Sequence, residues 1–267
     1  MVSVGGMTKT ARDLVDITSL LMSKTFDEKE LNAGWKQLKI GFLKGSEWTS
    51  PPGYTVPDDR LNKVKDREYA VCLRKIQEAG ATVTDVKLPP GSELVKGTCA
   101  SPNDLSMAHL RDDINRYLEN FEPVNTLDDL IAANKAHAHY ALPVEAPGQD
   151  SLVELVTYRW PSDKPGESSD ETLDIVFARG QQAFKDLGVD VVLACGEMHL
   201  KSFASIAGLP VSALPVCGTD DEFNGRRVGM MAAAMPGRED LLLRVAMAWN
   251  ESFPNAVEPP RMMRNVS

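Results

Sequence analysis

The stretch from Val189 to Trp249 reads VDVVLACGEMHLKSFASIAGLPVSALPVCGTDDEFNGRRVGMMAAAMPGREDLLLRVAMAW. Three of its segments are short, apolar and rich in β-branched or small residues: Val189–Ala194, Leu209–Val216 and Val228–Met235. Each is bounded by glycine, proline or charge, a pattern typical of buried strands. Between the first two, Lys201–Gly208 has the length of two helical turns. The stretch therefore predicts strand, helix, strand and strand.

A further helix is predicted after Pro236-Gly237, which interrupts the chain. Apolar residues then recur at helical spacing, at Leu241, Leu242, Val245, Ala246, Trp249 and Phe253. Upstream, Leu38–Leu43 and Ala81–Leu88 are predicted strands, joined by a helix that Asp58 or Asp59 can cap and that stops at Gly80. A strand–helix–strand unit of this length predicts a right-handed parallel pair.

The remaining segments are mainly helical. A first helix is expected after Thr10, which forms a capping box with Asp13. A more polar helical excursion is expected over about residues 103–157. Its first apolar stripe is Met107, Leu110, Ile114, Tyr117, Leu118 and Phe121, and a second begins after the capping pair Thr126 and Asp129. The fold class is therefore α/β, a mixed sheet of about five strands flanked by helices. We expect one domain over residues 1–253 and a loosely ordered tail over 254–267.

Several of these segments, in this order, resemble the C-terminal portion of the amidase signature family. IAGLPVSALPV, VGMM and PGREDLLLRVAMAW are similar to that family's "AGLPAISVPAG", "G-PVGLQ" and "G-E--LLR-A" segments. At the other end, GGMTKTARDLVDITSLL (Gly5–Leu21) resembles "GPMTRTVADAALLLDVL". The resemblance extends from about Val4 to Phe253 and implies a partial amidase signature fold.

The resemblance does not extend to the family's catalytic residues. Amidase signature enzymes use a Ser nucleophile, a bridging Ser and a Lys base, all in segments that precede "GPMTRT". No GGSS, SGGS or GSIR sequence occurs in these 267 residues. The resemblance therefore implies an amide hydrolase-like protein in which this catalytic triad has no counterpart, and we assign no catalytic residue. The missing strands would leave a sheet edge and the apolar face of Gly5–Met22 uncovered.

Composition limits the partners. Asp and Glu number 38 against 29 Lys and Arg, a net charge of −9, which disfavours nucleic acid and anionic membranes. No apolar run reaches the length of a transmembrane helix, and MVSVGGMTKT does not resemble a signal peptide. We expect a cytoplasmic protein. Self-association, or binding of a separate N-terminal amidase segment, would cover the exposed edge.

The four cysteines are the remaining chemistry candidates. They show no C-x-x-C spacing, so buried free thiols are expected rather than a zinc site or disulfides. Cys195 and Cys217 follow predicted strands and are hypothesised to line a substrate pocket for a small amide. Cys195 with His199 is an alternative nucleophile and base, weighed against a buried apolar role for the thiol. The acidic pairs are interpreted as solvated surface charge, and neither a metal nor a cofactor is expected.

Three functional hypotheses remain open from the sequence. The first is a catalytically incompetent amidase-family polypeptide, either a degenerate homologue or a truncated portion of a longer enzyme. The second is a chain that completes an amidase site in trans with a separate N-terminal chain. The third is a non-enzymatic module that binds small molecules or proteins. Pocket-side residues differ from the family pattern, since Leu193-Ala194-Cys195-Gly196 replaces "LLTPT", which favours an unusual or degenerate pocket.

Overall fold

The computed structural model describes residues 5–44, 58–144, 146–196, 199–218 and 227–254. By its internal contacts the chain divides into two compact units, Gly91–Phe177 and Val2–Pro90 together with Ala178–Ser267. The helical excursion expected at about 103–157 falls inside the first unit, and the single domain expected over residues 1–253 stays a prediction. Except for Pro254, the expected tail lies outside the described residues.

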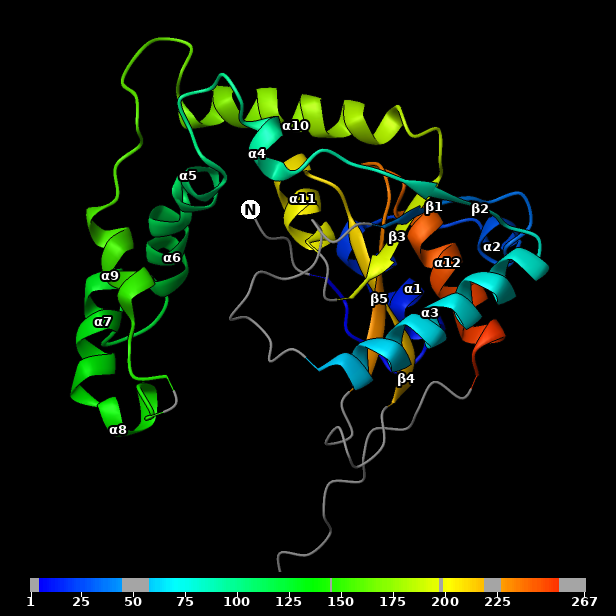
Figure 1. Ribbon diagram of the computed structural model, residues 1–267. Coiled ribbons are helices and arrows are strands. Elements are labelled where there is room, and N and C mark those ends of the chain that lie inside the picture. The colour runs from blue at the N-terminus through cyan, green and yellow to red at the C-terminus, as the bar shows by residue number, and fades with distance from the viewer. Residues whose placement is uncertain (1–4, 45–57, 145, 197–198, 219–226, 255–267) are drawn as a thin grey trace, which may run out of the picture. The chain divides into compact units, whose positions relative to one another are not determined.

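The larger unit is built on one mixed sheet in the order β2-β1-β3-β5-β4 (Figure 1). Its strands are β1 (Lys39–Leu43), β2 (Thr82–Val86), β3 (Val191–Cys195), β4 (Val211–Gly218) and β5 (Arg227–Ala233). β1 pairs in parallel with β2 and β3, whereas β5 runs antiparallel to β3 and β4. The predicted α/β class and the mixed five-stranded sheet are confirmed.

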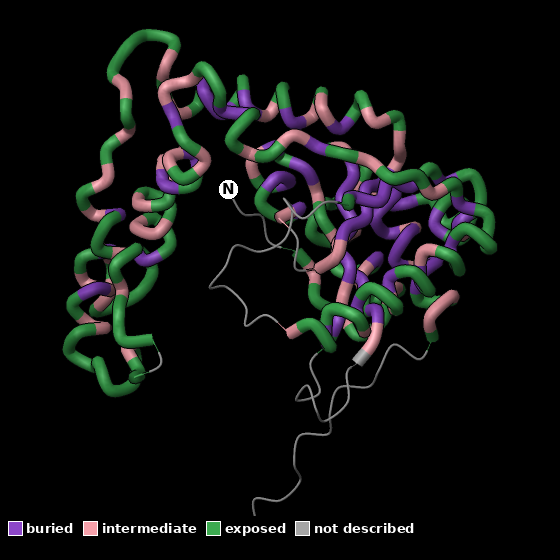
Figure 2. The backbone as a smooth tube through the Cα atoms, viewed as in Figure 1, coloured by how far each residue is buried: buried purple, intermediate pink, exposed green. Residues whose placement is uncertain are grey.

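The helices around this sheet include α1 (Ala11–Met22), α2 (Glu28–Leu31), α3 (Asp59–Glu78), α11 (Leu200–Ala207) and α12 (Glu239–Ser252). α3, α11 and α12 pack on the strands, whereas α1 and α2 pack on α12. Asp58 caps α3, and Gly208 ends α11 in the left-handed conformation that glycine adopts without a Cβ penalty, as predicted. The central strands are almost wholly buried (Figure 2), because apolar residues on both of their faces are covered.

The main core cluster combines α3, α12 and the sheet. Trp249 on α12 is 1% exposed, and its indole Nε1 donates a hydrogen bond to the Pro215 carbonyl at 2.6 Å. Trp35 packs edge-on against Trp249 and Phe253 packs against it at a tilt, at ring-centroid distances of 6.3 and 4.5 Å. These contacts bring Trp35, from the N-terminal part of the larger unit, and Phe253, from its C-terminal part, against the same indole ring.

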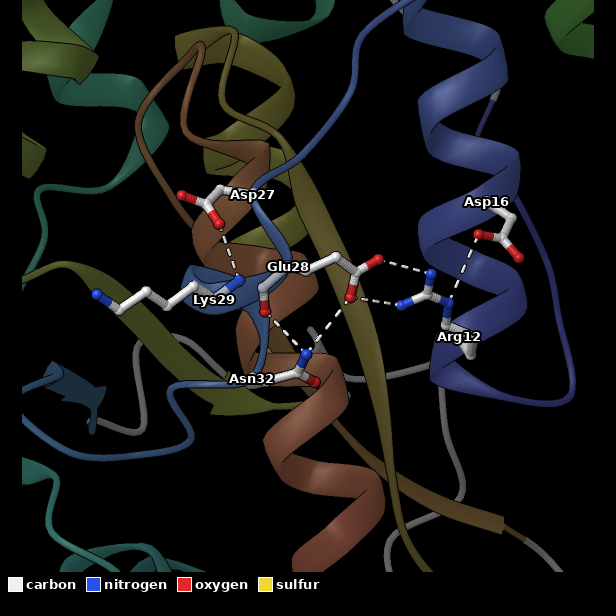
Figure 3. Close-up of polar contacts among 6 residues, drawn as sticks. All are labelled: Arg12, Asp16, Asp27, Glu28, Lys29 and Asn32. Carbon is white, nitrogen blue, oxygen red and sulfur yellow. Dashed lines mark hydrogen bonds and ion pairs between the residues drawn. The ribbon is translucent and has the colours of Figure 1, made fainter.

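α1 is attached to the same unit by a small core and an ion pair. Val15, Phe26, Leu31 and Leu243 form a buried cluster between α1, α2 and α12. At the surface, Arg12 contacts both carboxylate oxygens of Glu28, at 2.6 and 2.7 Å (Figure 3). Half of the predicted capping box is present, since the Thr10 side chain accepts a hydrogen bond from the Asp13 amide, without the reciprocal bond from the Thr10 amide to Asp13.

The smaller unit is helical. It contains α4 (Gly91–Leu94), α5 (Pro102–Met107), α6 (Leu110–Leu118), α7 (Leu127–Ala136), α8 (Ala138–Ala141), α9 (Asp150–Thr157) and the first part of α10 (Ser169–Lys185). The continuous stripe predicted from Met107 to Phe121 is wrong, because the helix breaks at Ala108-His109. Ser101 and Asp104 form a capping box that starts the separate short α5, and Leu110 and Phe121 are exposed.

Side-chain bonds to the backbone stabilise the turns of this unit. Thr126 and Asp129 form the predicted capping box at α7, and Leu127, Ile131 and Leu155 pack behind it. In the segment before α10, the Trp160 indole donates to the Glu167 carbonyl at 2.7 Å. Among the described residues, every helix is too short or too polar to span a bilayer.

Candidate functional site

The sheet brings the two predicted pocket cysteines to the same end of β3 and β4, the two strands that flank β5. Cys195 is the last residue of β3 and pairs with Met230 of β5, while Cys217 of β4 pairs with Val228 of β5. The two cysteines are separated along the chain, and β5 lies between their strands. Both side chains are half-buried and pack against the main core cluster.

α3 covers this end of the sheet with a stripe of inward-facing residues. Lys65, Tyr69, Cys72 and Ile76 are buried at helical spacing. The Tyr69 hydroxyl donates to the Gly229 carbonyl at 3.2 Å and also hydrogen-bonds the Cys195 side chain. A helix residue therefore links the ends of β3 and β5.

The Gly229 carbonyl accepts a second hydrogen bond from the Gly196 amide at 2.9 Å. A Cβ atom at Gly196 would lie 2.7 Å from that carbonyl oxygen, which is closer than real contacts allow. Glycine at position 196 therefore permits the close approach of β3 to β5 directly beside Cys195. The sequence signal for this approach was a glycine immediately after a buried strand.

The surroundings of the thiols favour their neutral form. Burial raises the pKa of Cys195 to about 11, and the nearby charge of Asp66 adds to the effect. Burial also raises the pKa of Cys217, with Glu68 contributing. The pKa of Cys72 is raised to about 12 by burial, with Glu68 and the Cys217 thiolate as further causes. Protonated thiols are poor nucleophiles and poor metal ligands.

The alternative pair of Cys195 and His199 is not assembled in the structure. His199 precedes α11 and makes no side-chain capping bond. His199 makes no hydrogen bond to Cys195, whose side chain is hydrogen-bonded to Tyr69 instead. No group of three or more His, Cys, Asp or Glu side chains could hold a metal ion, within the part of the chain that the structure describes.

The sequence did not single out Tyr69 and Cys72 as site residues, although both belong to the predicted apolar stripe of α3. Their place beside Cys195 and Cys217 depends on how α3 packs on the sheet, which a helical repeat does not specify. The pocket role of Cys195 and Cys217 stays a prediction. Chemically, the arrangement is a packed set of neutral thiols with one phenol.

Comparison with known proteins shows which solved structures share this architecture. No protein-family model and no curated protein matches the sequence. Among solved structures, an amidase family protein from Bacillus anthracis str. Ames aligns with a TM-score of 0.68 and 18% identity, over 97% of this chain and 50% of that chain. The peptide amidase from Stenotrophomonas maltophilia aligns with a TM-score of 0.64 and 18% identity, over 92% and 52%.

A bacterial aryl acylamidase of the amidase signature enzymes also aligns, with a TM-score of 0.52 and 16% identity, over 94% of this chain and 53% of that chain. At these identities the likeness establishes the fold. The chain has the fold of part of an amidase signature enzyme, and it spans about half the length of the structures that it matches.

Proposed function

We propose that this protein is an amidase-family, carbon–nitrogen hydrolase-like polypeptide that does not hydrolyse amides on its own. The observation that carries the proposal is the structural alignment, in which nearly the whole chain matches about half of an amidase. Two properties of the chain support the second part. Its sequence contains none of the family's GGSS-type or GSIR-type motifs, and the thiols at the candidate site are held in their neutral form.

The test is the turnover of a panel of aryl amides, linear carboxamides and esters by the purified protein. We expect no hydrolysis above background, either for the natural sequence or for Cys195→Ala and Cys217→Ala. The two variants decide between an intrinsic thiol site and contaminating activity. Robust amide turnover that either substitution abolishes would overturn the proposal and establish a cysteine nucleophile.

A second candidate function is completion of an amidase site in trans. It is favoured by the coverage of the solved structures, since the unmatched half of each is as long as the matched half. In this function a separate chain supplies Ser, Ser and Lys, and the present chain supplies pocket walls in the cytoplasm. The gene's upstream sequence should then encode a GGSSGG-type segment. Co-expression of that segment should yield amide turnover that neither chain has alone.

The pocket assignment is part of the same proposal and has its own test. A small amide bound at the ends of β3 and β4 would contact Cys195 and Cys217, which adjoin the same strand. Benzamide should then raise the melting temperature of the natural protein, and Cys217→Trp should abolish that shift. Cys99→Ala, in the other unit, serves as the matched control. A shift that survives Cys217→Trp would place the ligand elsewhere.

A further inference from the structure

The two edges of the sheet differ in how they are protected. β2 exposes Thr82, Thr84 and Asp85, and Asp85 forms an ion pair with Lys44 at 2.9 Å. β4 reads VSALPVCG and contains no charged residue. Charged side chains on an edge strand oppose the addition of another strand, whereas an uncharged apolar edge invites it. β4 is therefore the edge at which another chain can pair.

The register identifies which backbone groups of β4 face outward. The Ala234 amide donates to the Pro210 carbonyl at 3.3 Å, and Val211 is the next residue in the ladder, opposite Ala233. Since hydrogen-bonded and non-hydrogen-bonded pairs alternate in antiparallel strands, Ser212 and Leu214 bond toward β5. Val211, Ala213 and Pro215 consequently direct their backbone groups away from the sheet.

The outer edge is already closed at Pro215. Proline has no amide hydrogen, and the Pro215 carbonyl accepts the hydrogen bond from Trp249. The outward N–H and C=O groups of Val211 and Ala213 remain, and no strand or side chain of the described residues pairs with them. Val211 is 44% exposed and Ala213 is also exposed, so the unpaired segment has an apolar surface.

We propose that this edge is a dimer interface, at which β4 pairs antiparallel with β4 of a second copy about a two-fold axis at Ser212. Val211 of each copy then lies opposite Ala213 of the other, and each pair exchanges two N–H···O bonds. This register pairs the outward N–H and C=O groups of both Val211 and Ala213, and it requires no hydrogen bond from Pro215. An interface of this kind is isologous, because both copies contribute the same patch.

The β4 strand itself adds no charge repulsion to the pairing of two copies. The chain carries a net charge of −9, which opposes association in general. Two copies of β4 nevertheless meet without any like charges opposite one another, because the strand carries none. Charges elsewhere are screened beyond about 8 Å at physiological ionic strength. The dimer should therefore strengthen as the salt concentration rises.

Sedimentation equilibrium over a range of protein and salt concentrations tests the proposal. The natural protein should dimerise, and Val211→Lys with Ala213→Lys should raise the dissociation constant at least about tenfold, because it places like charges opposite one another. Thr82→Lys with Thr84→Lys is the matched control, with the same spacing on the other edge. This control should dimerise like the natural protein. Circular dichroism confirms that each variant folds.

A cross-link tests the register without adding charge. Ser212 faces its own counterpart across the axis as a non-hydrogen-bonded pair, where the Cα atoms lie about 4.5 Å apart, within the range of a disulfide. Ser212→Cys should form a covalent dimer when oxidised glutathione takes up the two electrons and two protons. Thr84→Cys and the natural sequence should not.

Three results would overturn the proposal. One is a monomer at every concentration and salt level. Another is a dimer that Val211→Lys with Ala213→Lys leaves unchanged, with no cross-link through Ser212→Cys. The third is a monomer that binds a co-expressed N-terminal amidase segment, in a complex that Val211→Lys with Ala213→Lys abolishes, because the edge would then belong to that partner.

Discussion

At the scale of single residues, the main property of the candidate site is that its three thiols do not readily ionise. A cysteine is a nucleophile or a metal ligand as the thiolate. Cys72 is 3% exposed, and Cys195 and Cys217 pack against the same core, so burial disfavours the charged form at each. The Tyr69 hydrogen bond and the Lys65 charge act in the opposite direction at Cys195 without reversing the effect of burial.

This environment predicts a pH dependence of stability. The pKa of Cys72 is raised to about 12 in the folded protein, against roughly 8.5 for an exposed thiol. Between these values the unfolded chain binds fewer protons, so the free energy of unfolding falls as the pH rises, by at most about 1.4 kcal/mol per pH unit for this group. Denaturant melts of the natural protein should therefore weaken from pH 8 to pH 10 more steeply than those of Cys72→Ala.

The comparison has an internal control, because both proteins should show the same pH dependence between pH 6 and pH 8, where the thiol is protonated in either state. If the free energies of unfolding of the two proteins change in parallel with pH up to pH 10, the raised pKa of Cys72 is contradicted.

Trp249 supplies a second prediction at this scale. Trp249→Ala should lower the free energy of unfolding by about 3–5 kcal/mol, because it removes a buried ring from the core. Trp249→Phe keeps most of the ring but removes the donor to the Pro215 carbonyl, and should cost about 1–2 kcal/mol. Denaturant melts measure both. If Trp249→Ala costs less than about 1 kcal/mol, α12 is peripheral and the core described above is wrong.

At the scale of elements, local sequence was sufficient to find the strands and the capped starts of α1, α3 and α7, whereas α2 and α4 were not predicted. β3 and β4 lie within two residues of their predicted starts, because each is a short apolar segment bounded by glycine, proline or charge. The order of the strands was not predictable, since nothing in the local pattern places β5 between β3 and β4. For the same reason, Cys195 and Cys217 were singled out separately, and their shared neighbour strand emerged from the register.

The capping box of α7 allows an element-scale test. The Thr126 hydroxyl accepts from the Asp129 amide at 3.1 Å, and the Thr126 amide donates to the Asp129 carboxylate at 3.1 Å. Thr126→Ala should therefore destabilise the smaller unit by about 1 kcal/mol, whereas Thr126→Ser retains the hydroxyl and most of the stability. Urea melts followed by circular dichroism compare the two. Equal losses in both variants would mean that the threonine methyl group, rather than the cap, is responsible.

At the scale of the whole molecule, the chain combines a closed interior with an open edge. The central strands are buried on both faces and contribute to one continuous core cluster. Among the described residues the sheet ends at β4, a strand without charged side chains. Two expectations for the isolated chain are independent of each other. The lack of activity depends on which catalytic side chains are present, whereas dimerisation depends on the β4 edge of the sheet.

The placement of the tryptophans has an optical consequence. Trp35 and Trp249 pack edge to face in the core of the larger unit, whereas Trp160 lies in the smaller unit, with its indole hydrogen-bonded to the Glu167 carbonyl. Trp48 lies outside the described residues. Replacing Trp48 and Trp160 with phenylalanine leaves emission that reports on the sheet, and replacing Trp48, Trp35 and Trp249 leaves one fluorophore that reports on the helical unit. Two spectroscopic variants of one chain can thus follow the melting of each unit separately.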